Sequence, residues 1–180
     1  MKKIFILILF FTISLTNINF AYSTSPDVFI QSTVNRASEL LSKNITKKEK
    51  MNELKIIAKE IVDIRGIGFY SLGSVRKNLD QKQKEKYSKL FEEYFLKSFS
   101  SRLAEYTDPE IEVKNQEILN KNYTIVKSVL VNTTERPEVL IDWRVYTKNP
   151  DKPLVRDLII EGLSLARTQK EEFSSILNSN

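Results

Sequence analysis

The 180-residue chain contains no cysteine and no histidine. Without cysteine it forms no disulfide, so an oxidising compartment is neither required nor used. Without either residue it also lacks the usual zinc ligands, the Ser-His-Asp triad and histidine acid–base chemistry. We therefore expect no metal, no catalytic cofactor and no enzymatic activity.

Glycine is also scarce, and three of the four glycines fall in one short stretch. Gly66, Gly68 and Gly73 lie within residues 63–73, where the first two are expected to weaken any helix and the third can end one. A phosphate-cradling loop would need a preceding strand and a Lys-Ser or Lys-Thr pair after the last glycine. Both are missing, so this stretch does not indicate a nucleotide site.

Long apolar runs are missing except at the start of the chain. Residues 4–11 are unbroken apolar sequence that follows two lysines, and this run is shorter than the roughly 20 residues of a membrane span. Residues 21–23 (Ala-Tyr-Ser) have the spacing for signal-peptide cleavage after Ser23. An uncleaved anchor is the alternative, whereas the absence of cysteine excludes a lipoprotein anchor. We expect residues 1–23 to be a cleaved signal peptide and residues 24–180 to form one domain.

Charge of one sign is not concentrated in any segment. The formal net charge is +5, but basic and acidic residues are interleaved, as in the segments KKEK and QKQKEK. Such interleaving is typical of solvated helix faces. The charge is too diffuse to indicate nucleic-acid binding, and it leaves only a weak attraction to anionic lipid headgroups.

The first half of the chain has helical periodicity. Residues 25–26 (Ser-Pro) indicate a helix start, and residues 46–49 and 80–83 fit the capping-box pattern for a second and a third helix. The third helix is long and carries a mostly aromatic stripe: Tyr87, Leu90, Phe91, Tyr94, Phe95, Phe99, Leu103 and Tyr106. Such a stripe packs in a core or lines a cavity, and the sequence leaves both interpretations open.

After residue 109 the period changes from helical to alternating. Strands are predicted from residue 111 and over residues 123–131, 139–146 and 154–160, with short polar loops between them. Glu161-Gly162 ends the last strand, and Ser164 is a candidate N-cap for a closing helix. Helices followed by successive antiparallel strands and one closing helix predict a single α+β domain with a sheet of about four strands.

Three blocks of sequence resemble a known family. The first block is residues 71–73 (Ser-Leu-Gly), followed ten positions later by Gln83 and then by the stripe. The second block is residues 99–106. The third block is residues 141–144 (Ile-Asp-Trp-Arg) together with Asp157, residues 161–164 and Phe173. In order and spacing they resemble the MlaC family, also called the toluene-tolerance family, of periplasmic phospholipid-binding proteins. One position departs from the family pattern, because Arg76 stands where an aromatic residue usually follows the Leu-Gly pair.

The resemblance implies a twisted antiparallel sheet packed by N-terminal helices, one long central helix and a C-terminal helix, NTF2-like in broad outline. It implies an apolar pocket for the acyl chains of a phospholipid, the one expected ligand. Such a protein would carry lipid through the periplasm between the inner and outer membranes, in an ABC transport pathway for outer-membrane lipid asymmetry. The implied partners are an inner-membrane ABC transporter with an MCE-domain subunit and an outer-membrane lipoprotein complex, with no nucleic acid, and the chain is expected to be a monomer.

The expected pocket combines the aromatic stripe with strand residues. Ile141, Trp143 and Val145 alternate along one strand, and we place that face toward the stripe. The expected lipid-binding residues are Phe69, Tyr70, Leu72, Phe91, Tyr94, Phe95, Phe99, Ile125, Val129, Ile141, Trp143, Val145, Ile159 and Leu163.

Two other interpretations compete with a lipid carrier. Ser164 near Asp157 and Glu161 could form a lipid-ester hydrolase site. However, without histidine Ser164 would need a lysine base, and nothing in the sequence places one beside it. The structural interpretation makes Ser164 a helix cap and the acids partners of Arg144, Arg156 or Arg167. A periplasmic chaperone or interaction module of similar fold is the second alternative.

Overall fold

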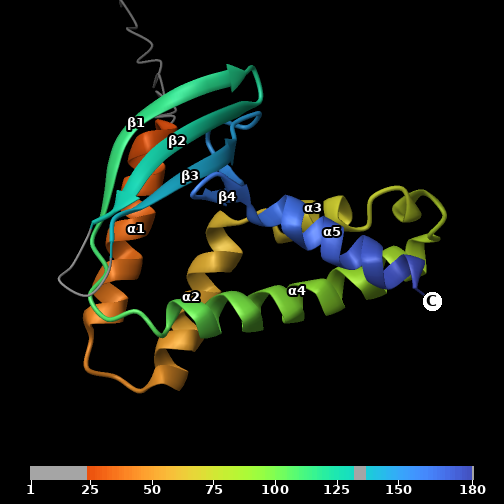
Figure 1. Cartoon of the computed structure of the whole chain (residues 1–180), viewed down its shortest axis with the longest axis horizontal. Coiled ribbons are helices and arrows are strands. Elements are labelled where there is room, and N and C mark those ends of the chain that lie inside the picture. The colour runs from red at the N-terminus through yellow and green to blue at the C-terminus, as the bar shows by residue number, and fades with distance from the viewer. Residues whose placement is uncertain (1–23, 132–136, 180) are drawn as a thin grey trace, which may run out of the picture.

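The computed structural model describes residues 24–131 and 137–179 (Figure 1). The predicted signal peptide and most of the loop before the third strand lie outside these residues. Within them the chain forms five α-helices, one 3-10 turn and a five-stranded sheet. None of the described helices combines the length and the apolar character that a membrane crossing requires.

The first two helices begin where the sequence places them. Helix α1 (Pro26–Ser42) has proline in its first turn, but the Ser25 hydroxyl bonds to the Asp27 carboxylate and makes no side-chain cap. Helix α2 (Lys47–Ile61) has the full capping box, in which Thr46 and Glu49 satisfy each other's backbone N–H groups. The capping box of α2 is therefore confirmed. The Ser-Pro helix start is found in its proline but not in a serine cap, because the Ser25 oxygen accepts from Gln116 on β1 at 3.1 Å instead of from a backbone N–H of α1.

The glycine-containing stretch forms a helix despite its two weakening glycines, and Gly73, with a φ of 55°, follows its C-cap as the expected terminating glycine. Helix α3 (Ile64–Ser71) contains Gly66 and Gly68 and is capped by Asp63, whose carboxylate accepts from the Gly66 N–H at 2.9 Å. A Cβ atom built on Gly68 would lie 2.7 Å from Cδ1 of Phe91. The missing side chain thus lets α3 approach the next long helix closely, and tertiary packing overrides the low helix propensity.

The long helix α4 (Gln81–Leu103) follows a 3-10 turn, η1 (Val75–Lys77), and starts at an Asp80–Gln83 capping box, as predicted. Phe91, Phe95 and Phe99 are four residues apart and therefore share one face. The ring centroids of Phe91 and Phe95 lie 6.3 Å apart, and those of Phe95 and Phe99 lie 5.5 Å apart. Both pairs of rings are stacked. Part of the predicted stripe is thus a ladder of stacked phenylalanine rings along α4, whereas Leu90 is exposed and Tyr106 lies beyond the end of the helix.

The sheet is an antiparallel meander with strands in sequence order: β1 (Ile111–Asn120), β2 (Tyr123–Leu130), β3 (Val139–Tyr146), β4 (Leu154–Ile160) and β5 (Leu163–Ser164). The fifth strand corrects the expected count of about four. Glu161 and Gly162 both have positive φ angles, 48° and 80°, as a two-residue hairpin turn requires. This turn pairs Leu163 and Ser164 back onto β4 before helix α5 (Leu165–Asn178) begins.

The pairing register divides the sheet into two faces. Val126 pairs with Trp143 and Trp143 with Leu158, so these three side chains share the face that meets the helices. Trp143 is buried there, and its indole N–H donates to the Ser128 hydroxyl at 2.8 Å. Arg144, paired with Asp157, lies on the opposite face.

The helices form a layer on one side of the sheet (Figure 1). Helix α1 packs on β1 and β2, while α2 packs on α4 and α3 packs on both α4 and α5. Helix α5 packs on β4, and α4 lies across from the sheet, held mainly by α2 and α3. This arrangement leaves room between α4, β4 and α5 for the site described below.

Candidate functional site

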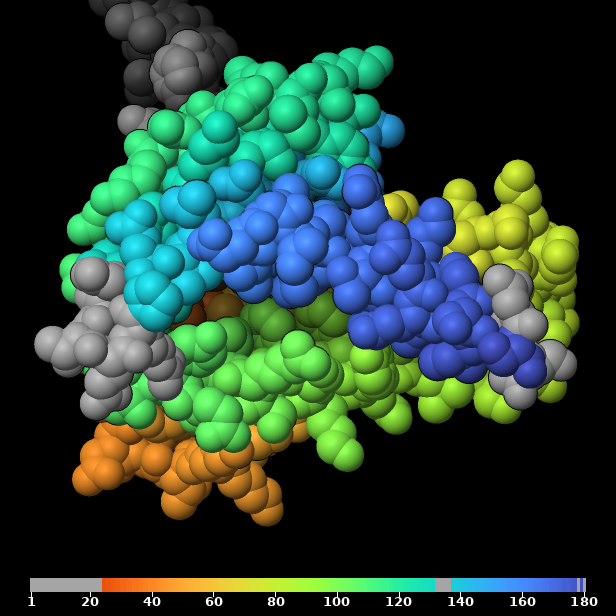
Figure 2. All heavy atoms as spheres, in the orientation of Figure 1, coloured from red at the N-terminus to blue at the C-terminus, as the bar shows by residue number. Residues whose placement is uncertain are grey.

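A cavity of about 180 Å³ lies between α4, β4 and α5. Figure 2 shows the hollow between the green atoms of α4 and the blue atoms of β4 and α5. It is lined by Val62 and Ile67, by Phe91, Tyr94, Phe95, Ser98, Phe99 and Arg102 of α4, by Val155, Asp157 and Leu158 of β4, and by Leu165, Ala166, Thr168, Gln169 and Glu172 of α5.

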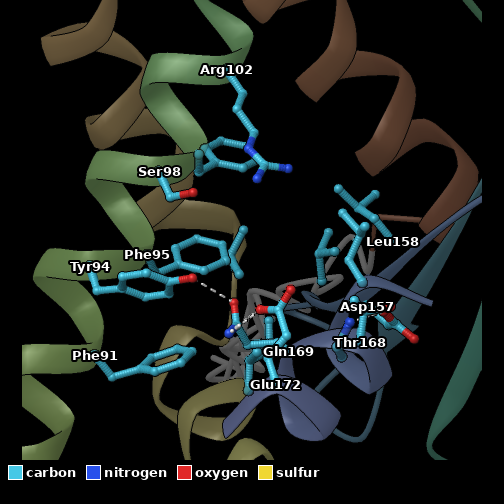
Figure 3. A pocket seen from close by; sticks show the side chains of 16 residues that line it. Phe91, Tyr94, Phe95, Ser98, Arg102, Asp157, Leu158, Thr168, Gln169 and Glu172 are labelled. Atoms are coloured by element: carbon cyan, nitrogen blue, oxygen red, sulfur yellow. Dashed lines mark hydrogen bonds between the residues drawn. The ribbon is translucent and has the colours of Figure 1, made fainter. Parts of the chain in front are cut away.

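The inner wall of the cavity is apolar. The ring ladder of Phe91, Phe95 and Phe99 lines the cavity from α4, and Val155 and Leu158 line it from β4. Figure 3 shows Phe91 and Phe95 on the helix and Leu158 on the strand. Phe91 is buried, whereas Phe95 and Phe99 are half-buried. Aromatic rings and branched aliphatic side chains offer a surface that takes up hydrocarbon and repels polar groups.

The rim of the cavity is polar. Tyr94, Ser98 and Arg102 follow one edge of α4, and the Tyr94 hydroxyl donates to Oε1 of Gln169 on α5 at 3.1 Å (Figure 3). Gln169 in turn donates through Nε2 to Glu172 at 3.1 Å. The chemistry of the site therefore changes from hydrocarbon inside to hydrogen-bonding groups at the opening.

An aromatic partition separates this cavity from a second apolar groove at the tip of the molecule. The Phe173 ring meets Phe91 edge-on at 5.9 Å and Tyr94 at 5.8 Å between centroids. Beyond it, η1, α4 and α5 enclose a groove of about 410 Å³ that includes Tyr87. Burial raises the pKa of the Tyr87 phenol, and its hydrogen bond with Ser71 at 2.8 Å opposes that shift.

Asp157 fixes the start of α5 to β4. The residue is only 3% exposed, and its two carboxylate oxygens accept from the Ser164 hydroxyl at 2.6 Å and from the Ala166 N–H at 3.0 Å. The Ser164 oxygen also accepts from the Arg167 N–H at 3.1 Å. Ser164 is therefore a helix cap anchored to a carboxylate, as the structural interpretation predicts, and not a free nucleophile.

Glu161, the other acid near the closing helix, accepts from the Leu140 N–H at 2.6 Å. It thereby ties the turn after β4 to β3. Among the described residues, no group of three histidine, cysteine, aspartate or glutamate side chains is placed to hold a metal ion.

Comparison with known proteins places the chain in a family. A family model described as "MlaC protein" matches residues 31–180. The chain belongs to the MlaC family. The "Intermembrane phospholipid transport system binding protein MlaC" of Haemophilus influenzae is 24% identical over 163 residues, which cover 86% of this chain and 76% of that protein.

The α+β fold of this MlaC-family chain is also found in a solved structure. The phospholipid-binding protein of Ralstonia solanacearum, determined in complex with a phospholipid, superposes with a TM-score of 0.72. The match covers 87% of this chain and 89% of that one, at 17% sequence identity. The MlaC resemblance and the α+β fold class expected from the sequence are both confirmed.

Four of the fourteen expected lipid-binding residues line the cavity of this MlaC-family protein: Phe91, Tyr94, Phe95 and Phe99. Leu72 lines the groove at the tip. Phe69 and Tyr70 line a different cleft, on the other side of α3 and α5. Lipid contact stays a prediction for all fourteen, and the geometry supports it most directly for the four.

The expected strand residues do not gather around one space. Trp143 and Val145 belong to the closed core, and Ile141 packs against that core without lining the cavity. Ile125, Val129 and Ile159 lie on the opposite face, because they pair with Arg144, Leu140 and Asp142. Leu163 is 70% exposed at the turn into β5. The register corrects the expected arrangement, in which all these residues shared one pocket.

The strand that lines the cavity is β4, which the sequence-based set represented by Ile159 alone. Leu158 and Val155 are the β4 residues on the helix-facing side. The rim residues Gln169 and Arg102 were also missed. A signal existed for Gln169, since it follows Leu165 and precedes Phe173 at four-residue spacing on the closing helix.

Proposed function

We propose that this protein is a phospholipid carrier and that the cavity between α4, β4 and α5 receives the acyl chains. The observation that carries the proposal is the cavity's apolar interior with a polar rim. An amphiphile fits this order of surfaces, with its chains inside and its headgroup at the opening. The phospholipid bound by the Ralstonia solanacearum protein of the same fold supports the assignment.

Entry of a phospholipid would require the cavity walls to separate. The cavity measures about 180 Å³, below the roughly 300–1,000 Å³ typical for drug-sized ligands. Helices α4 and α5 both pack on α3, and across the rim they meet through the Tyr94–Gln169 hydrogen bond and the Phe173 ring contacts. These direct contacts join α5 to α4 across the rim, so the opening would widen by separating them while α5 stays anchored to β4 through Asp157.

Release of the cargo would be slow without a partner. Two acyl chains bury roughly 28 methylenes at about 0.8 kcal/mol each, or roughly 22 kcal/mol in total. This figure exceeds the practical ceiling of about 18–21 kcal/mol for non-covalent affinity, before the entropic cost of ordering the chains reduces it. A carrier with such a pocket needs a docking partner that opens the walls.

We place this carrier in the periplasm, between the inner and outer membranes. The name of the Haemophilus influenzae relative, an intermembrane phospholipid transport protein, supports this location. The expected partners are the inner-membrane ABC transporter with its MCE-domain subunit and an outer-membrane lipoprotein complex. In this role the chain binds and releases lipid without chemical turnover.

Lipid extraction from purified protein tests the proposal. The full chain, secreted through its own N-terminal segment and purified without detergent, is extracted with organic solvent and analysed by mass spectrometry. We expect about one phospholipid molecule per protein chain. We also expect little preference for one headgroup over another, because apolar walls discriminate ligands by the volume of their acyl chains. A lipid-free extract that stays lipid-free after incubation with phospholipid vesicles would overturn the proposal.

A further inference from the structure

A second, polar cleft of about 590 Å³ lies on the other side of the β4–α5 junction from the apolar cavity. The two spaces share Ile67, Asp157 and Ala166 as a common wall. The cleft is lined by residues of α3 and η1 and by residues at the turn of the β1–β2 hairpin. Segments far apart in sequence therefore enclose it.

Three arginines line this cleft: Arg76 from η1, Arg144 from β3 and Arg156 from β4. Among the described lining residues Asp157 is the only acid. Asp63, outside the lining, also forms an ion pair with Arg156. Three arginines against these two carboxylates leave the cleft with a small excess of positive charge, held at Arg76 and Arg144.

Arg156 is held rigidly in the cleft. Its Nε donates to Oδ2 of Asp63 at 2.7 Å, and its Nη1 donates to the Tyr123 hydroxyl at 2.7 Å. The guanidinium also lies 3.6 Å from the centroid of the Tyr146 ring. These hydrogen bonds use Nε and Nη1 and fix the orientation of Nη2. No described residue forms a hydrogen bond with Nη2.

Arg144 has unused hydrogen-bonding capacity. Its Nε is buried and has no hydrogen-bond partner among the described residues. Its Nη1 lies 3.6 Å from Oδ2 of Asp157, beyond ordinary hydrogen-bond length. Asp157 cannot readily move closer, because Ser164 and Ala166 already bond to its two oxygens.

Arg76 completes the set from the rim of the cleft. It is exposed and makes no hydrogen bond or ion pair with any other described residue. Three guanidinium groups thus line one concave space. Its lining acid, Asp157, already accepts from Ser164 and Ala166, and Asp63 compensates Arg156 alone. Guanidinium forks match the oxygens of a phosphate group, and they bind it more tightly than neutral donors do.

We infer that this cleft binds a phosphate group through Arg76, Arg144 and Arg156. The inference does not depend on the proposed lipid cavity, since the two spaces are separated by the Asp157–Ala166 wall. Phe69 and Tyr70 at the edge provide an apolar surface for the organic part of a phosphate ester. That ester is either a soluble molecule or the headgroup of a lipid at a membrane surface.

Titration calorimetry with sn-glycerol 3-phosphate tests the soluble source, and cosedimentation with phosphatidylglycerol vesicles tests the membrane source. The Arg76→Gln and Arg144→Gln variants remove charge from the cleft, whereas Lys77→Gln removes the same charge from the neighbouring exposed position. Loss of a charge-assisted hydrogen bond corresponds to about a tenfold or greater loss of affinity. Thermal melts by circular dichroism verify that each variant is folded.

We expect at least one phosphate probe to bind the wild-type protein. Folded Arg76→Gln should bind that probe with about tenfold lower affinity, and the affinity of Lys77→Gln should stay within about twofold of wild type. Binding of glycerol phosphate alone identifies a soluble ester, and binding of vesicles identifies a headgroup. The inference is overturned if neither probe binds, or if Lys77→Gln weakens binding as much as Arg76→Gln does, because the effect would then be diffuse charge.

Discussion

Leu158→Glu separates an open cavity wall from a closed core. Leu158 is half-buried and faces α4 across the cavity (Figure 3). Full burial of a leucine side chain contributes about 1.5–3 kcal/mol to the free energy of unfolding. Replacing the half-buried Leu158 should therefore lower the free energy of unfolding by about 1–2 kcal/mol. The new carboxylate can reach water at the polar rim, and we expect the melting temperature to fall by only about 2–8 °C.

The same substitution in the closed core has a different expected outcome. Leu54 on α2 is 1% exposed, so Leu54→Glu buries a carboxylate with no path to water. An unpaired buried charge costs several kcal/mol in addition to the lost leucine packing. Since a domain has about 5–15 kcal/mol of stability in total, we expect Leu54→Glu to unfold.

Ile141→Glu provides the third comparison. Ile141 lies on the same sheet face as Leu158, but it packs against the core and does not line the cavity. We therefore expect the loss of stability in Ile141→Glu to be closer to that of Leu54→Glu than to that of Leu158→Glu. Circular dichroism melts with lipid quantification by mass spectrometry are run on all three variants. Leu158→Glu should be folded and lipid-poor. If it unfolds as readily as Leu54→Glu, or retains full lipid, β4 does not line a binding cavity and the site is assigned incorrectly.

Two further substitutions probe how the cavity is held in shape. Gly68→Ala should destabilise by about 1–2 kcal/mol in urea unfolding, because overpacking against the Phe91 ring at 2.7 Å outweighs the better helix propensity of alanine; a more stable variant would mean that the ring yields without strain. Asp157→Ala should cost about 3 kcal/mol or more in the same assay, since Ser164 and Ala166 lose their buried acceptor. A change below about 1 kcal/mol would show that α5 is anchored mainly by its other contacts.

Features that depend on neighbouring residues in sequence were predictable. The capping boxes of α2 and α4 and the cap at Ser164 each need only a side chain and an N–H three residues away. The aromatic stripe is equally local, because residues four apart share a helix face. These signals are sufficient for the starts of α2, α4 and α5 and for the α4 side of the cavity.

Features that depend on strand register were not predictable from one sequence. Adjacent residues of a strand point to opposite faces, so Ile159 and Leu158 exchange roles if the pairing shifts by one position. The register is set by long-range pairs such as Trp143 with Leu158, which no local pattern specifies. The packing of Gly68 on Phe91 is also long-range, and it explains why glycines that discourage a helix are found inside one.

The β4–α5 junction has the apolar cavity on one side and the arginine-lined cleft on the other. Substitutions on each side therefore test whether the cavity and the cleft bind their ligands independently. Asp157 lies in the wall that divides the apolar cavity from the arginine-lined cleft. Leu158 contacts only the first space, and Arg76 contacts only the second. We therefore expect Leu158→Glu to remove lipid while phosphate binding persists, and Arg76→Gln to weaken phosphate binding while bound lipid persists. If each substitution reduced both ligands together, lipid and phosphate would be parts of one molecule that spans the junction, and the wall at Asp157 would have to open for it to bind.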